Sequence, residues 1–114
     1  VKNSNFEKIN EKNGYYLYEK AKEGDLEAYR KLQDLLVWYF MKKTVKYDMP
    51  VQIHFAITDH YVEYFDPMNL SNMLQDKELQ DAKIVILHAG YPRYKRAGLM
   101  ALGGLKPNNV YIDI

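Results

Sequence analysis

The chain has 114 residues, with 16 Lys and Arg residues against 15 Asp and Glu residues, a formal net charge of +1 and no cysteine. This length permits one domain at most. The small net charge gives no electrostatic case for binding a nucleic acid or an anionic membrane. The lack of cysteine excludes disulfides and thiolate metal sites. No apolar stretch approaches the roughly 18 residues that a membrane span needs, and no signal segment opens the chain, so we expect a cytoplasmic protein.

The first 48 residues are predicted to be helical. Ser4 and Glu7 have the S-x-x-E spacing of a capping box, so we expect a first helix to begin there. A longer second helix should start after Asp25, a candidate N-cap, and end near Tyr47, because Pro50 disfavours helical geometry in the residue before it. Its apolar residues recur at steps of three and four and predict a stripe of the kind that faces a core: Leu26, Tyr29, Leu32, Leu36 and Phe40, widened by Leu35, Trp38 and Tyr39.

Three short apolar runs are predicted strands: Pro50–His54, Lys83–His88 and Asn109–Asp113. Helices are expected between them. Asp66 and Pro67 supply an N-cap and a first-turn proline for one helix, while Pro92 can open another that Gly103 and Gly104 can close. Strands that alternate with helices in this way favour parallel pairing with right-handed crossovers.

Each predicted strand ends in a residue that can do chemistry, namely His54, His88 or Asp113. In (β/α)8 barrels the reacting groups sit at the C-terminal ends of the parallel strands, and a closed barrel needs about 250 residues. The sequence therefore predicts a partial domain of the α/β class, a segment of a TIM barrel. Residues 1–114 would form this one domain, with a helical segment at 1–48 and a strand–helix–strand–helix–strand order at 49–114.

Period-two alternation predicts which strand side chains share a face of the sheet. Counted from the strand ends, His88 shares a face with Ile84 and Ile86, opposite Val85 and Leu87. If the histidine-bearing face is the barrel interior, one set of side chains converges on the barrel axis: Gln52, His54, His88, Tyr111 and Asp113.

Taken together, the motifs Pro50–His54, Ile84–Pro92 and Asn109–Asp113 resemble those of the amidohydrolase-related family of metal-dependent barrel hydrolases, which also contains non-oxidative decarboxylases. The helical region from Gly24 to Trp38 is similar to the segment that precedes the fifth barrel strand in nodulin-like members. The resemblance covers roughly the whole chain.

The resemblance implies roles for the three strand-end residues. His54 matches a metal ligand at the end of the fifth barrel strand, and His88 matches a sixth-strand histidine that binds a second metal or the substrate. Asp113 matches a seventh-strand position. The resemblance therefore makes His88 and Asp113 the candidate catalytic residues, and His54 and His88 the candidate metal ligands. The family's His-x-His pair and eighth-strand aspartate are absent from this sequence, and Phe55–Ala56 replaces a small Thr-Gly pair.

The implied cofactor is a divalent metal, zinc in the first place and manganese as an alternative. A neutral imidazole can bind such an ion, which lowers the pKa of bound water toward about 7. The expected function is part of an amidohydrolase-type hydrolase, with metal-activated water attacking an amide or ester-like bond. A non-oxidative decarboxylase and a non-catalytic α/β interaction module stay open as alternatives. Because ligands are missing, we expect this chain alone to bind metal weakly or not at all, and to be inactive.

Each singled-out residue also has a structural interpretation. His54 and His88 could be hydrogen-bonded core histidines, and Asp113 could cap a helix or bond a loop amide. The loop histidine His60 is more simply exposed to solvent, and the nearby aromatic residues Tyr61, Tyr64 and Phe65 could line or cover a pocket.

Substrate contacts are expected from Arg93, Tyr91 and Gln52, with the Arg93 guanidinium able to clamp a carboxylate. Lys95 and Arg96 are expected on a solvated helix face. The expected partners are a small-molecule substrate and, since a barrel segment exposes strand edges and apolar faces, a second copy of the chain.

Overall fold

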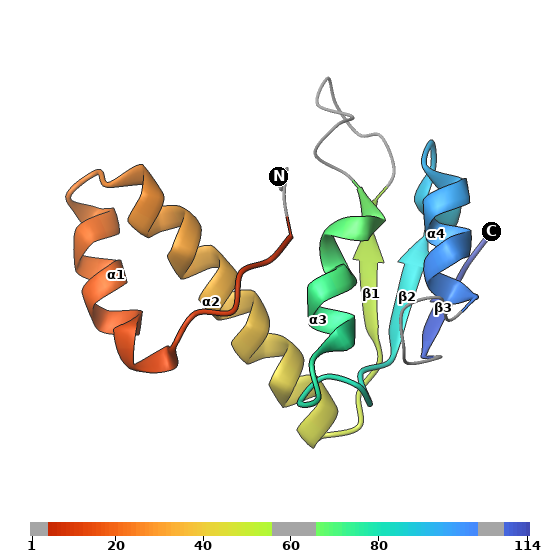
Figure 1. The fold of residues 1–114 in the computed structure, drawn as a ribbon, viewed down its shortest axis with the longest axis horizontal. Helices are drawn as coiled ribbons and strands as arrows, with labels where there is room; N and C mark the ends of the chain where they lie inside the picture. The colour runs from red at the N-terminus through yellow and green to blue at the C-terminus, as the bar shows by residue number, and fades with distance from the viewer. Residues whose placement is uncertain (1–4, 56–65, 103–108) are drawn as a thin grey trace.

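The computed structural model describes residues 5–55, 66–102 and 109–114. In chain order its elements are η1 (Glu11–Asn13), α1 (Gly14–Lys22), α2 (Leu26–Lys46), β1 (Val51–His54), η3 (Pro67–Leu70), α3 (Ser71–Gln75), β2 (Ile84–Leu87), η4 (His88–Gly90), α4 (Tyr94–Ala101) and β3 (Val110–Ile112). The helices α1 and α2 pack on each other and lie to one side of the three strands (Figure 1). No helix in these ranges is long and apolar enough to cross a membrane.

The strands form a parallel sheet in the order β1-β2-β3. Val51 lies level with Ile84, and Ile84 lies level with Val110, so the three strands end at the same edge. Parallel pairing of strands separated by helices confirms the predicted α/β class and is consistent with a segment of a TIM barrel.

One face of this sheet is covered by α3 and α4 (Figure 1). Ile84 and Ile86 are fully buried on that face, in a core that includes Met73 of α3 and Ala97 and Met100 of α4. Side chains alternate along a strand, so Val85 and Leu87 lie on the opposite face. Residues level with one another in neighbouring strands point to the same side. That opposite face also carries Gln52, His54 and Tyr111, all of which are exposed.

This register corrects one prediction. Alternation counted back from His88 placed Ile84 and Ile86 on the histidine-bearing face, but these two isoleucines face the helices. The regular strand ends at Leu87, one residue before the histidine, so His88 does not follow the alternation of β2.

Helix α2 begins and ends where the sequence predicts, but most of the predicted apolar stripe does not face the core. Asp25 accepts the Ala28 N–H at 3.0 Å as the N-cap. The predicted stripe is largely in solvent, with Leu26, Tyr29, Leu36 and Phe40 exposed by 81, 52, 54 and 55%. The buried residues of the helix are instead Ala28, Asp34, Leu35, Trp38, Met41 and Thr44. Apolar residues surround much of the helix, so the packing of α1 and of the sheet core decides which side is covered.

The predicted start of the first helix is wrong. Residues 5–10 are not helical, Asn10 caps η1, and α1 begins only at Gly14; Ser4 lies outside the described residues. The backbone of this segment is bound by other elements instead. The Phe6 N–H donates to the Asn69 carbonyl at 3.2 Å, and the Glu7 N–H donates to Asp34 Oδ2 at 3.0 Å. Local capping therefore loses to partners on α2 and at η3.

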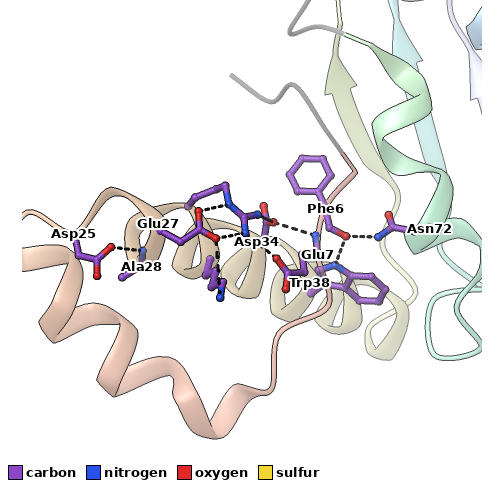
Figure 2. Close-up of polar contacts among 10 residues, drawn as sticks. Phe6, Glu7, Asp25, Glu27, Ala28, Asp34, Trp38 and Asn72 are labelled. Atoms are coloured by element: carbon purple, nitrogen blue, oxygen red, sulfur yellow. Dashed lines mark hydrogen bonds and ion pairs between the residues drawn. The ribbon is translucent and has the colours of Figure 1, made fainter.

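The segment forms a strap between α2 and α3, as Figure 2 shows. The Phe6 carbonyl accepts hydrogen bonds from the Trp38 indole at 3.1 Å and from the Asn72 amide. Trp38 is only 4% exposed, which confirms its predicted place in the core. The strap thus joins the long helix to the helices that cover the sheet.

Between β1 and β2 the predicted capping chemistry is confirmed. The Asp66 carboxylate accepts the Met68 N–H at 3.0 Å, and Pro67 opens η3, which continues into α3. Between β2 and β3, α4 begins two residues after Pro92 and ends at Ala101. The predicted closing glycines, Gly103 and Gly104, lie outside the described residues.

Candidate functional site

The two strand-end histidines lie together at the C-terminal edge of the sheet. The ring centroids of His54 and His88 are 5.0 Å apart, with an angle of 79° between the ring planes. Both residues are exposed to solvent. The prediction that these two histidines converge is therefore confirmed, and neither one is a buried core histidine.

His88 reaches this position through a left-handed turn. His88, Ala89 and Gly90 have φ values of 57°, 52° and 66°. The regular alternation of β2 would send His88 to the helix-covered face beside Ile86, whereas the turn redirects the chain at that residue. A non-glycine residue in this region costs about 1–2 kcal/mol, so the surroundings of His88 and Ala89 have to hold the turn in place.

Helix α4 holds the turn from one side. A Cβ added at Gly90 would lie 2.9 Å from the Ala97 Cβ and 3.3 Å from the Pro67 Cγ, so only glycine fits between these side chains. The Arg93 N–H donates to the Gly90 carbonyl at 2.8 Å and fixes the exit toward α4. The backbone therefore approaches its neighbours closely here, as glycine permits.

Asp113 holds the turn from the other side. Its Oδ1 accepts the His88 N–H, and its carbonyl accepts the Ala89 N–H at 2.8 Å. Its own N–H donates to the Ile86 carbonyl at 3.1 Å, which extends the ladder between β2 and β3. The structural interpretation of Asp113 as a partner of a loop amide is thus confirmed.

The two imidazoles make an edge-to-face ring contact, and their spacing is also compatible with two ligand positions of one metal ion. Rings that share a tetrahedral zinc ion, with zinc–nitrogen bonds of about 2 Å, have centroids about 5 Å apart. The observed centroid separation is 5.0 Å. Within residues 5–55, 66–102 and 109–114, however, no group of three His, Cys, Asp or Glu side chains could hold a metal. This part of the chain offers two donors and not a complete ligand set.

The three predicted substrate contacts lie close to this pair along the chain. Gln52 lies on the same face of β1 as His54, two residues before it, and is exposed. Tyr91 follows the turn directly, is 58% exposed and donates its N–H to the His88 carbonyl at 2.9 Å. Arg93 is half-buried at the start of α4. Their roles toward a substrate stay predictions.

The remaining candidates lie on α4, directly after β1 or outside the described residues. Lys95 and Arg96 are both exposed as predicted, and Arg96 also forms an ion pair with Asp66 that ties α4 to η3. Phe55 is 7% exposed and belongs to the core under the helices, so its ring is not on the face that carries His54. His60, Tyr61, Tyr64, Phe65 and Ala56 lie outside the described residues.

Sequence reasoning missed how the turn is built. The left-handed backbone of Ala89 has no local signal, and histidine, although more common at positive φ than most residues, is too weak a signal to predict the turn. The usable signals were Gly90, which permits a close approach, and Asp113, whose capacity to bond a loop amide was evident from its place at a strand end.

The comparisons with known proteins give a family match. The model of the amidohydrolase family matches residues 13–114, most of the chain. No curated protein and no solved structure gives a significant match.

Proposed function

Because the chain belongs to the amidohydrolase family, we propose that it supplies part of the active site of a metal-dependent hydrolase that cleaves an amide or ester-like bond. The observation that carries this proposal is the pairing of the His54 and His88 rings at 5.0 Å on the C-terminal edge of a parallel sheet. This edge is where barrel enzymes place their reacting groups.

In this proposal the imidazoles of His54 and His88 bind one divalent metal, zinc or, as an alternative, manganese. The ring spacing of 5.0 Å favours this shared ion over the second metal or substrate contact that the resemblance implies for His88. When bound, such an ion supplies a water molecule whose pKa is lowered toward about 7, together with polarisation of the bond to be cleaved. The histidines contribute neutral nitrogen donors held by the sheet. Further ligands have to come from beyond the described residues, since these hold no complete set.

The substrate is proposed to lie against the exposed sheet face beside this pair. Arg93 could pair with a substrate carboxylate, because a guanidinium presents two parallel donors, while Gln52 and Tyr91 could donate hydrogen bonds from either side of the histidines. The same contacts suit a decarboxylase, whose substrate carries the carboxylate that is lost. Hydrolysis is the first choice because the family match describes an amidohydrolase.

A titration followed by nuclear magnetic resonance tests the metal centre. As Zn²⁺ is added, the ring signals of His54 and His88 should shift together at the same metal concentration. His54→Ala should abolish the response of His88, and His88→Ala that of His54. Tyr111→Phe serves as the control, because Tyr111 is exposed on the same sheet face and is not a metal donor in the proposal.

The outcomes are distinct. Two donors leave part of the zinc coordination sphere unfilled, so we expect weak binding. If neither ring responds in the wild-type protein, or if each responds independently of the other, the shared metal centre is refuted and a non-catalytic interaction module is favoured.

A further inference from the structure

The position of His88 depends on a turn that its own sequence does not favour. His88 and Ala89 adopt left-handed backbone conformations that residues with a Cβ rarely adopt, and Gly90 follows in the same conformation. The turn therefore has to be held by groups outside it, and those groups decide where the His88 ring lies.

Both N–H groups at the start of the turn are bound by one residue. Asp113 Oδ1 accepts the His88 N–H, and the Asp113 carbonyl accepts the Ala89 N–H at 2.8 Å. Asp113 is itself fixed to β2 through its N–H, which donates to the Ile86 carbonyl at 3.1 Å. A single residue at the end of β3 thus links the sheet to both left-handed residues.

We propose that Asp113 is a positioning residue, which holds the left-handed turn so that the His88 ring lies against the His54 ring. The effect of this positioning on metal binding rests on the function proposed above, whereas the positioning itself does not. This assignment differs from a direct catalytic role, in which Asp113 would contact the metal or substrate.

The chemistry of the contact separates the two roles. Accepting a backbone N–H requires an oxygen with a lone pair at that place, which an asparagine carbonyl also provides. Binding a cationic metal or carrying a proton requires the carboxylate. Asp113→Asn should therefore preserve positioning and remove a direct catalytic role, while Asp113→Ala removes the side-chain acceptor in either case.

The test measures backbone protection and ring contact in the protein without metal. In Asp113→Ala, we expect hydrogen exchange of the His88 amide to accelerate at least tenfold and the nuclear Overhauser contact between the His54 and His88 rings to disappear. Asp113→Asn should keep both. The amides of Ile84 and Ile86, which are fully buried, report in the same spectra whether the sheet stays folded.

A second variant keeps the proposal falsifiable if Asp113→Ala loosens the sheet. Glycine adopts a positive φ without steric cost, so adding Ala89→Gly to Asp113→Ala should lower the cost of the turn and restore part of the ring contact. Ala101→Gly, in the last turn of α4, is the matched control and should restore nothing.

Two results would overturn the positioning role. One is an unchanged His88 amide and ring contact in Asp113→Ala with a folded sheet. The other is an Asp113→Asn variant that loses the ring contact and the protection of the His88 amide while the sheet stays folded, because the asparagine carbonyl keeps the acceptor oxygen that the positioning role requires. If the wild-type rings do not respond to Zn²⁺, the metal centre fails, while the exchange and ring-contact measurements still decide the positioning role.

Discussion

Asp34 on α2 accepts the backbone N–H of Glu7 at 3.0 Å and thereby fixes the strap, residues 5–10, to the long helix (Figure 2). The side chain of Asp34 is 1% exposed and also pairs with Arg30 Nη1 at 3.1 Å. A buried carboxylate with two such partners organises its surroundings, because removing it leaves donors unsatisfied.

We therefore predict that Asp34→Ala lowers the free energy of unfolding by about 2 kcal/mol, since bonds to charged groups contribute about 1.5–3 kcal/mol. Urea denaturation measures the change. Glu27→Ala is the matched control, because Glu27 pairs with the same Arg30 but is 63% exposed. An exposed pair is worth about 0–1 kcal/mol, so equal losses in the two variants would contradict the prediction.

A second contact of the strap should respond to pH. Lys8 Nζ lies 2.7 Å from Asp76 Oδ2, and this hydrogen bond lowers the pKa of Asp76 below its ordinary value. A carboxyl whose pKa is lowered on folding stabilises the folded state above its unfolded pKa of about 3.9, and this contribution disappears as pH falls through the lowered pKa.

Asp76→Asn should consequently reduce the free energy of unfolding at pH 7 by under about 1 kcal/mol, because Lys8 is half exposed. At a pH below the lowered pKa of Asp76, the same substitution should not reduce it. Unfolding by urea at pH 7 and at stepwise lower pH checks this. The double variant Lys8→Met/Asp76→Asn should lose less stability than the sum of the losses in the two single variants. The difference is the interaction energy of the pair. A stability difference that is constant with pH would refute the link.

Gly90 allows a direct test of the packing under the turn. Gly90→Ala should destabilise the protein by about 1–3 kcal/mol, because its Cβ meets Ala97 and the backbone has a positive φ. Gly98→Ala in α4 is the matched control: nothing lies within 4 Å of its Cβ, and alanine favours a helix by about 0.8–1 kcal/mol. The midpoint of thermal unfolding should therefore fall in Gly90→Ala and rise in Gly98→Ala. A shift of the same sign in both variants would contradict this packing.

The exposed stripe of α2, formed by Leu26, Tyr29, Leu36 and Phe40, predicts self-association. The first turn of the helix carries Glu27 and the last carries Lys43 and Lys46, so an antiparallel pair of α2 helices would set acidic ends against basic ends. Phe40→Glu should shift the mass measured by light scattering toward the monomer. Tyr15→Glu, an exposed change on α1, should leave the mass unchanged, and a monomeric wild-type protein would refute the prediction.

Local chemistry explains what could be predicted from the sequence. The N-caps at Asp25 and Asp66 and the proline at position 50 act on neighbouring residues, so the bounds of α2, η3 and β1 follow from short-range rules. The common edge of parallel strands likewise places the ends of β1 and β2 side by side, where His54 and His88 lie, although strand alternation gives the wrong face for His88.

What could not be predicted depends on partners far along the chain. The strap is not helical because Asp34 and Asn69 bind its N–H groups. The outward face of α2 depends on what packs against the helix, and the turn at His88 depends on Asp113 of another strand. Capping rules and hydrophobic periodicity contain none of this information.

The parallel register also bears on how the site assembles during folding. His54 ends β1, His88 directly follows the neighbouring strand β2, and the residue that holds His88 directly follows the third strand. Such contacts form only after loops have closed at an entropic cost, so folds rich in them form slowly. The histidine pair should therefore appear late in folding, after β1 and β2 have paired and as β3 joins the sheet.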